Sequence, residues 1–129
     1  MGKYFICKGS IFKLYDCLMQ HAGVLSAKAK SLQPQAAKDY AKARAYWDAC
    51  DFAKAECYHP RHCYDEINSL SKEAEELREK AEKLKAWADT FTWVKTSKGE
   101  RADCSKKQSD FMFRLASEYK ELIETYCSK

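Results

Sequence analysis

The chain has 129 residues, of which 46% are hydrophobic and 33% are charged, with four glycines, two prolines and a formal net charge of +4. This length fits one ordinary domain with one core, and the composition excludes a disordered chain and a loop-rich disulfide knot. The mild positive charge gives no reason to expect a nucleic-acid partner, because the lysines alternate with alanines and acidic residues instead of forming a basic cluster.

Residues 10–33 are expected to form the first helix, with Ser10 as its N-cap. Its apolar stripe at three- and four-residue spacing consists of Ile11, Leu14, Leu18, Ala22, Leu25, Ala29 and Leu32. Pro34 cannot continue a helix but suits the first turn of a new one. We therefore expect a turn at Gln33, a second helix over 34–58, and an antiparallel first hairpin over residues 7–58.

Residues 65–94 show the most regular pattern of the chain and predict a third helix with a coiled-coil-like seam. The seam consists of Ile67, Leu70, Ala74, Leu77, Ala81, Leu84, Ala88 and Phe91. A loop is expected over 95–103 and a fourth helix over 103–126, which gives a second hairpin over residues 64–127. The expected fold is therefore all-α: a single helical domain, residues 1–129, built from four helices as two antiparallel hairpins.

Membrane and targeting signals are weak in this sequence. No stretch approaches the roughly 20 apolar residues that span a bilayer, so we expect a protein peripheral to membranes. The first residues lack a long apolar core and a small-residue cleavage site, so no secretory signal is expected. Trp47 and Phe91 fall on the apolar helix faces, and most such rings fill protein interiors. They are therefore expected in the core.

Cysteine is the most informative residue type here. Seven are present: Cys7, Cys17, Cys50, Cys57, Cys63, Cys104 and Cys127. In an oxidising compartment they would form disulfides, and an odd count leaves one thiol over. If each hairpin turns where expected, the residues placed side by side predict Cys17–Cys50, Cys7–Cys57 and Cys63–Cys127. Cys104 is then the free thiol.

The spacing Cys7-x9-Cys17, followed by a return helix with Cys50 and Cys57, resembles the twin Cys-x9-Cys (coiled-coil-helix-coiled-coil-helix) proteins of mitochondria. The resemblance covers residues 7–57. The second motif departs from the pattern, because six residues separate Cys50 from Cys57, or twelve separate Cys50 from Cys63. The resemblance implies oxidative trapping in the intermembrane space and a role as an accessory subunit or assembly factor of a respiratory complex.

Metal binding and catalysis find little support in the sequence. Cys57, His59, His62 and Cys63 are the one candidate zinc site, but their spacing is unlike ordinary zinc pairs, and a tight interhelical turn explains them better. No nucleophile elbow, phosphate-binding glycine loop or paired acids are present. We therefore expect no metal, no cofactor and no enzymatic activity.

These observations predict a non-catalytic accessory subunit or assembly component of a mitochondrial respiratory-chain or ATP synthase complex, on the intermembrane-space side. Its partners would be other protein subunits of a large complex, with no nucleic acid. Two alternatives stay open. One is a secreted, extracellular, disulfide-stabilised helical binding module, and the other is a cytosolic coiled-coil adaptor with reduced thiols.

Overall fold

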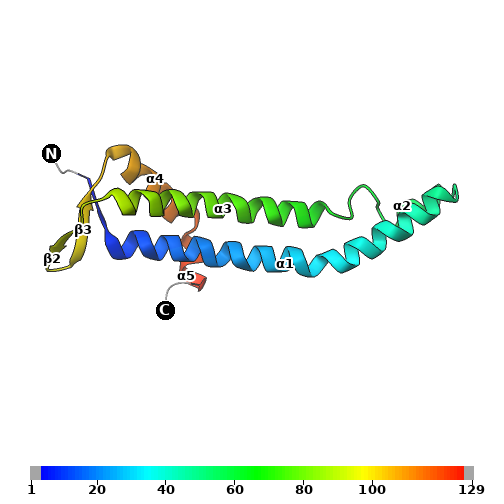
Figure 1. Cartoon of the computed structure of the whole chain (residues 1–129), viewed down its shortest axis with the longest axis horizontal. Coiled ribbons are helices and arrows are strands. Elements are labelled where there is room, and N and C mark those ends of the chain that lie inside the picture. Colours follow the sequence, from blue (N-terminus) through cyan, green and yellow to red (C-terminus); the bar gives the residue numbers. More distant parts are fainter. Residues whose placement is uncertain (1–3, 127–129) are drawn as a thin grey trace. The chain divides into compact units, whose positions relative to one another are not determined.

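The computed structural model describes residues 4–126 of the chain, which are mainly helical (Figure 1). The elements in chain order are β1 (Phe5–Cys7), α1 (Lys8–Asp48), α2 (Phe52–Cys57), α3 (Asp65–Thr90), β2 (Val94–Thr96), β3 (Gly99–Asp103), α4 (Lys106–Glu118) and α5 (Lys120–Tyr126). The predicted helical character is confirmed, whereas the three strands and the number of helices differ from the prediction. Within residues 4–126, no helix combines the length and the apolar character that a bilayer span requires.

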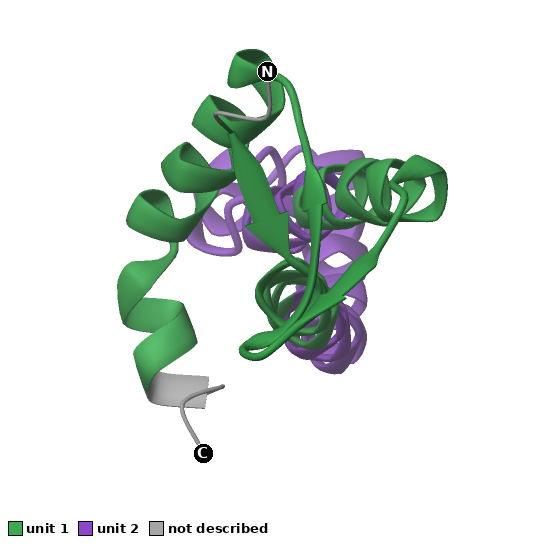
Figure 2. Cartoon of the chain, turned by 90° about the vertical axis from the view of Figure 1, so that its left-hand side faces the viewer, with its two compact units in different colours: residues 1–21, 77–129 green, residues 22–76 purple. Residues whose placement is uncertain are grey.

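The chain forms two compact units, which Figure 2 colours separately. Unit 1 consists of residues 1–21 and 77–129, and unit 2 consists of residues 22–76. The boundaries fall inside α1 and α3, so each of these helices contributes one part to each unit. The two units are described separately below.

Helix α1 is continuous, and the predicted turn at Gln33 is wrong. Pro34 lies in the interior of this 41-residue helix, which begins at Lys8 rather than after Ser10. The apolar stripe does not end at the proline, because Ala36 and Ala43 beyond it are buried as well. In unit 2 this stripe packs against α3 in a cluster of Ala29, Leu32, Ala36, Ile67 and Leu70. Burial on both sides of Pro34 offsets the backbone hydrogen bond that proline cannot donate.

Helix α3 follows the prediction closely, although it ends at Thr90 rather than at residue 94. Six seam positions are buried: Ile67, Ala74, Leu77, Ala81, Leu84 and Ala88. Two side chains donate hydrogen bonds to backbone carbonyls at the C-terminal end of the helix. Thr90 Oγ1 donates to the Trp87 carbonyl at 2.8 Å, and Trp93 Nε1 donates to the Ala88 carbonyl at 3.2 Å.

Residues 95–103, expected as a loop, contribute to a three-stranded antiparallel sheet with the order β1-β3-β2. In the hairpin β2–β3, Lys95 pairs with Glu100, and Gly99 has a φ of 110°, a conformation that glycine adopts readily. Strand β1 pairs with β3 from nearly 100 residues earlier in the chain, with Ile6 opposite Ala102. Ala102 is buried at the centre of this small sheet.

The predicted fourth helix is divided into α4 and α5 at Tyr119. Helix α4 begins with a capping box: Gln108 N donates to Ser105 Oγ at 3.1 Å, and Ser105 N donates to Gln108 Oε1 at 3.0 Å. Within unit 1, α4 packs on α3, where the Trp87 and Phe111 rings meet edge to face at 5.1 Å.

Candidate functional site

The cysteines are not paired as the sequence predicted. Free thiols are present at Cys7, Cys50, Cys57, Cys63 and Cys104, whereas Cys17 is disulfide-bonded and buried. The structure therefore contains neither Cys17–Cys50 nor Cys7–Cys57, and Cys63 forms no bridge. Both pairs in the first hairpin required a turn at Gln33, which α1 does not make. Cys127, the predicted partner of Cys63, lies outside the described residues.

The alternative zinc site at Cys57, His59, His62 and Cys63 is not assembled. No group of three or more His, Cys, Asp or Glu side chains within residues 4–126 is arranged to hold a metal ion. Cys63 Sγ donates instead to the Tyr58 carbonyl at 3.1 Å, and His62 Nδ1 lies 2.6 Å from an Asp65 carboxylate oxygen.

Two thiols have shifted acidity. Burial raises the pKa of Cys63, and the nearby Asp39 carboxylate raises it further by disfavouring a second negative charge. Burial also raises the pKa of Cys104, with Asp103 adding to the effect. Because the thiolate is the nucleophilic and metal-binding form, these environments favour inert thiols.

A cluster of exposed aromatic and arginine side chains distinguishes unit 2. We call it the aromatic surface and define it as Tyr40, Arg44, Trp47, Phe52, Arg61 and Tyr64. Trp47 is 46% exposed, and the other three rings are each more than one-third exposed. The Trp47 and Phe52 rings meet edge to face at 4.7 Å, and the Tyr40 and Tyr64 rings are 6.0 Å apart. The core position predicted for Trp47 is therefore wrong.

The chain reversal after α1 places these rings together. Cys50 and His59 have φ values of 61° and 48°, which are unusual for residues other than glycine, and they flank α2. Asp51 caps α2 by accepting a hydrogen bond from Lys54 N at 3.3 Å. The Tyr46 and Tyr58 rings stack at 5.9 Å and link α1 to the residue that follows α2. The local fold thus holds Phe52 against Trp47.

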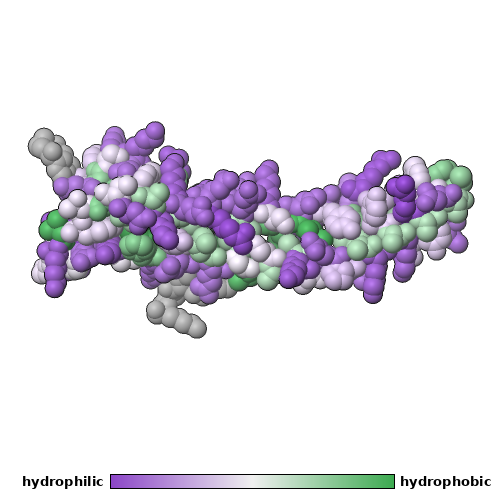
Figure 3. Space-filling model, in the orientation of Figure 1, coloured by the Kyte–Doolittle hydropathy of each residue, from purple (hydrophilic) through white to green (hydrophobic). Residues whose placement is uncertain are grey.

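The aromatic surface encloses a notch of about 310 Å³, lined by Tyr40, Ala43, Arg44, Trp47, Pro60 and Arg61. Arg44 lies 3.5 Å from Asp48 on the same helix, whereas Arg61 has no ion-pair or hydrogen-bond partner among the residues that the structure describes. Hydrophilic residues cover most of the face shown in Figure 3, and hydrophobic residues appear on it in several small patches, one of them at the end formed by α2. The notch offers ring faces and one free guanidinium, but no pair of acid and base groups.

The sequence did contain a signal for this surface. Residues 40–64 hold six of the 17 aromatic residues of the chain in a fifth of its length. Helical spacing alone places Trp47 on the apolar face of a second helix and therefore predicts that its ring lies in the core. Only the observed path of α2 and the following loop shows that nothing in the described part of unit 2 covers these rings completely.

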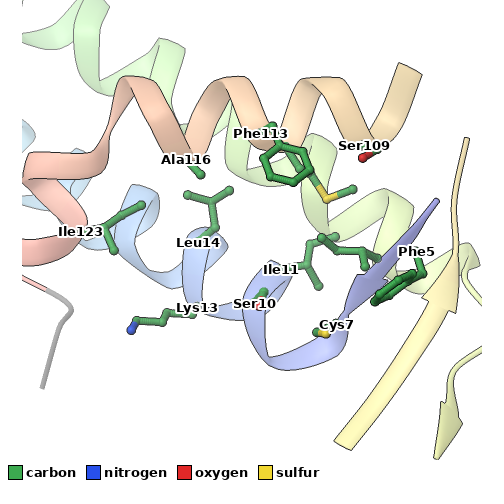
Figure 4. Close-up of a pocket in the computed structure, with 12 residues that line it drawn as sticks. Phe5, Cys7, Ser10, Ile11, Lys13, Leu14, Ser109, Phe113, Ala116 and Ile123 are labelled. Atoms are coloured by element: carbon green, nitrogen blue, oxygen red, sulfur yellow. The ribbon is translucent and has the colours of Figure 1, made fainter. Parts of the chain in front are cut away.

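Unit 1 holds a second concave site, an apolar groove of about 350 Å³ between β1, α1, α4 and α5 (Figure 4). Figure 4 shows Leu14 of α1 pointing toward Ala116 of α4, with Ile123 of α5 on one side and Phe5 of β1 on the other. Lys13 is the one charged residue among those lining the groove. The sequence analysis did not predict this site, because β1 was not recognised as a strand.

No family model, no curated protein and no solved structure matches this chain.

Proposed function

We propose that this protein is a non-catalytic binding component that contacts a protein partner through the aromatic surface of unit 2. The observation that carries the proposal is the exposure of four large aromatic rings beside Arg44 and Arg61. Trp, Tyr and Arg are the residues most enriched at the energetic centres of protein interfaces. A contiguous patch of exposed apolar side chains usually marks a site where a soluble protein contacts a partner.

The charges of the surface define the partner further. The Arg61 guanidinium is available to bind a carboxylate of the partner, whereas the Arg44 guanidinium forms an ion pair with Asp48. We therefore expect a partner with an apolar group for the notch and an acidic side chain for Arg61. A nucleic acid fits less well, since unit 2 carries eight Lys and Arg residues against nine Asp and Glu residues and so has no excess of positive charge to neutralise phosphates.

The experiment is affinity purification of the tagged full chain from its native source, followed by identification of the proteins that co-purify. We expect a partner that binds the natural sequence and is lost with the double variant Trp47→Ala and Arg61→Ala. The matched control is Phe113→Ala, which removes an exposed ring from unit 1 instead. Recovery of the same partner with the double variant would contradict the proposal.

The specific form of the proposal is an accessory or assembly component of a mitochondrial respiratory-chain or ATP synthase complex in the intermembrane space. It is supported by the seven cysteines and by their resemblance to the twin Cys-x9-Cys spacing. A secreted binding module is the alternative location for an oxidised protein. Cell fractionation separates these forms, because native protein found only in the medium or the cytosol excludes the mitochondrial one.

The second candidate is the cytosolic coiled-coil adaptor with reduced thiols. Two observations favour it: five cysteines are free thiols, although Cys17 is disulfide-bonded, and six of the eight predicted seam positions are buried. The deciding measurement is intact mass after alkylation in denaturant of protein isolated without reductant, because unfolding exposes the buried Cys17. Alkylation of all seven cysteines supports the adaptor and excludes both oxidised forms, whereas uptake of fewer than seven labels excludes the adaptor.

A further inference from the structure

The groove of unit 1 has the dimensions and the lining of a small-ligand site. Its volume of about 350 Å³ falls within the range of about 300–1,000 Å³ that is typical of such sites. Ile11 and Leu14 of α1 form its floor and are almost completely buried, so this part of the groove is built from the packed core. Phe113 and Phe5 at its sides are 74% and 49% exposed. Two large rings are thus left in water beside a preformed apolar cavity.

The charge at the groove is of one sign. Lys13 is the one charged residue in the lining, and it forms no ion pair or hydrogen bond with any residue that the structure describes. The nearby Lys8 is already paired with Glu100 at 3.0 Å and is absent from the lining. An occupant with an anionic group could therefore place it at Lys13 without meeting a carboxylate in the groove.

We propose that this groove binds a single-chain amphiphilic carboxylate, such as a free fatty acid. Its alkyl chain lies between Leu14 and Ala116, where it covers Phe113 and Phe5. The exposed Lys13 side chain, which Figure 4 shows pointing away from Ala116, turns toward the groove, and its Nζ donates hydrogen bonds to the carboxylate. Removing the alkyl chain and the two exposed rings from water supplies the affinity. The lysine supplies the preference for an anion. A neutral ligand would gain nothing from Lys13, which is exposed to water, and a cationic one would be repelled by it.

This inference is independent of the proposed protein-binding function, because it concerns unit 1 and rests on none of the residues of the aromatic surface. Either proposal can fail while the other stands. A site for a soluble amphiphile also differs from a membrane-docking face. The ligand here is a single molecule in solution, and binding must saturate at one molecule per chain.

The test is isothermal titration of the full chain with sodium decanoate below its critical micelle concentration. We expect saturable binding of one decanoate per chain. Lys13→Met should weaken it about fivefold, as expected for loss of one largely exposed ion contact. Ala116→Phe should abolish it, since the added ring occupies the groove. Ala116 is exposed, so this variant should fold, and circular dichroism verifies that it does.

Matched controls are Lys30→Met and Ala27→Phe, which make the same changes at exposed positions of α1 in unit 2. Both should bind decanoate like the natural sequence, and decyltrimethylammonium should bind far more weakly than decanoate. The proposal is overturned by the absence of saturable binding. It is overturned equally by folded Ala116→Phe protein that binds as tightly as the natural sequence, or by equal binding of the cationic amphiphile.

Discussion

Replacing Pro34 by alanine tests the continuity of α1 directly, because the two possible local structures predict opposite signs. Inside a helix, proline is about 3 kcal/mol less favourable than alanine, since it lacks the N–H and its ring crowds the carbonyl of residue i−4, here Lys30. Proline also restricts the unfolded chain, which offsets about 0.4–1 kcal/mol of this penalty. Pro34 is exposed, so no cavity forms when its ring is removed. Pro34→Ala should therefore stabilise the protein by about 2 kcal/mol.

A turn at Gln33 would give the reverse result. Proline is favoured in the first turn of a helix, so alanine there would lose only the restriction of the unfolded chain and would destabilise the protein slightly. Urea unfolding followed at 222 nm measures the difference. With an unfolding entropy of about 2.1 cal/mol/K per residue over the whole chain, 2 kcal/mol corresponds to a rise in Tm of about 7 °C. Gln35→Ala, one exposed position away, should change the free energy of unfolding by less than about 0.5 kcal/mol. Unchanged or lower stability of Pro34→Ala would refute the continuous helix.

Three further predictions concern packing, capping and thiol chemistry. Leu84 is completely buried, so Leu84→Ala should lower the free energy of unfolding by about 3 kcal/mol. Val94 is 58% exposed, so Val94→Ala should lower it by less than about 0.5 kcal/mol. Equal effects of the two variants in urea titrations would contradict the packing described for α3. Ser105→Ala removes the capping box of α4 and should lower stability by about 1 kcal/mol, seen as a reduced urea midpoint. Because raised pKa values leave less thiolate at neutral pH, iodoacetamide should label Cys63 and Cys104 more slowly than the three exposed thiols at pH 7.5. The labelling rates of Cys63 and Cys104 should keep rising above pH 9. Labelling of these two thiols at pH 7.5 as fast as that of the exposed thiols would contradict their raised pKa values.

Periodicity predicted the helical parts of the fold where one face is buried along its whole length. Apart from the partly buried Leu32 and Leu70, the stripe from Ile11 to Leu32 and the seam from Ile67 to Ala88 are buried as expected, because three- and four-residue spacing puts those side chains on one side of a helix. The same rule could not decide what happens at Pro34. A local penalty of a few kcal/mol competes there with burial of Ala36 and Ala43, and only the packed structure shows which is larger.

The sheet and the disulfide pattern could not be predicted, for a related reason. Strand β1 has only three residues, and its partner β3 is nearly 100 residues away, so no local pattern marks the pairing. The bridges were inferred from a hairpin register, and one wrong turn at Gln33 made the predicted pairs Cys17–Cys50 and Cys7–Cys57 wrong together.

The aromatic surface lies where the chain departs most from local rules, and this supports a functional interpretation. Cys50 and His59 adopt left-handed backbone conformations that cost non-glycine residues about 1–2 kcal/mol each, on either side of α2. Trp47 and Phe52, the rings that these residues position, remain about half exposed. Complete burial of these side chains therefore does not offset the backbone conformational energy. Natural chains keep such local conflicts mainly at functional sites. A partner that covers the rings would supply the burial that unit 2 itself lacks, and this relation links the strained segment to the proposed binding function.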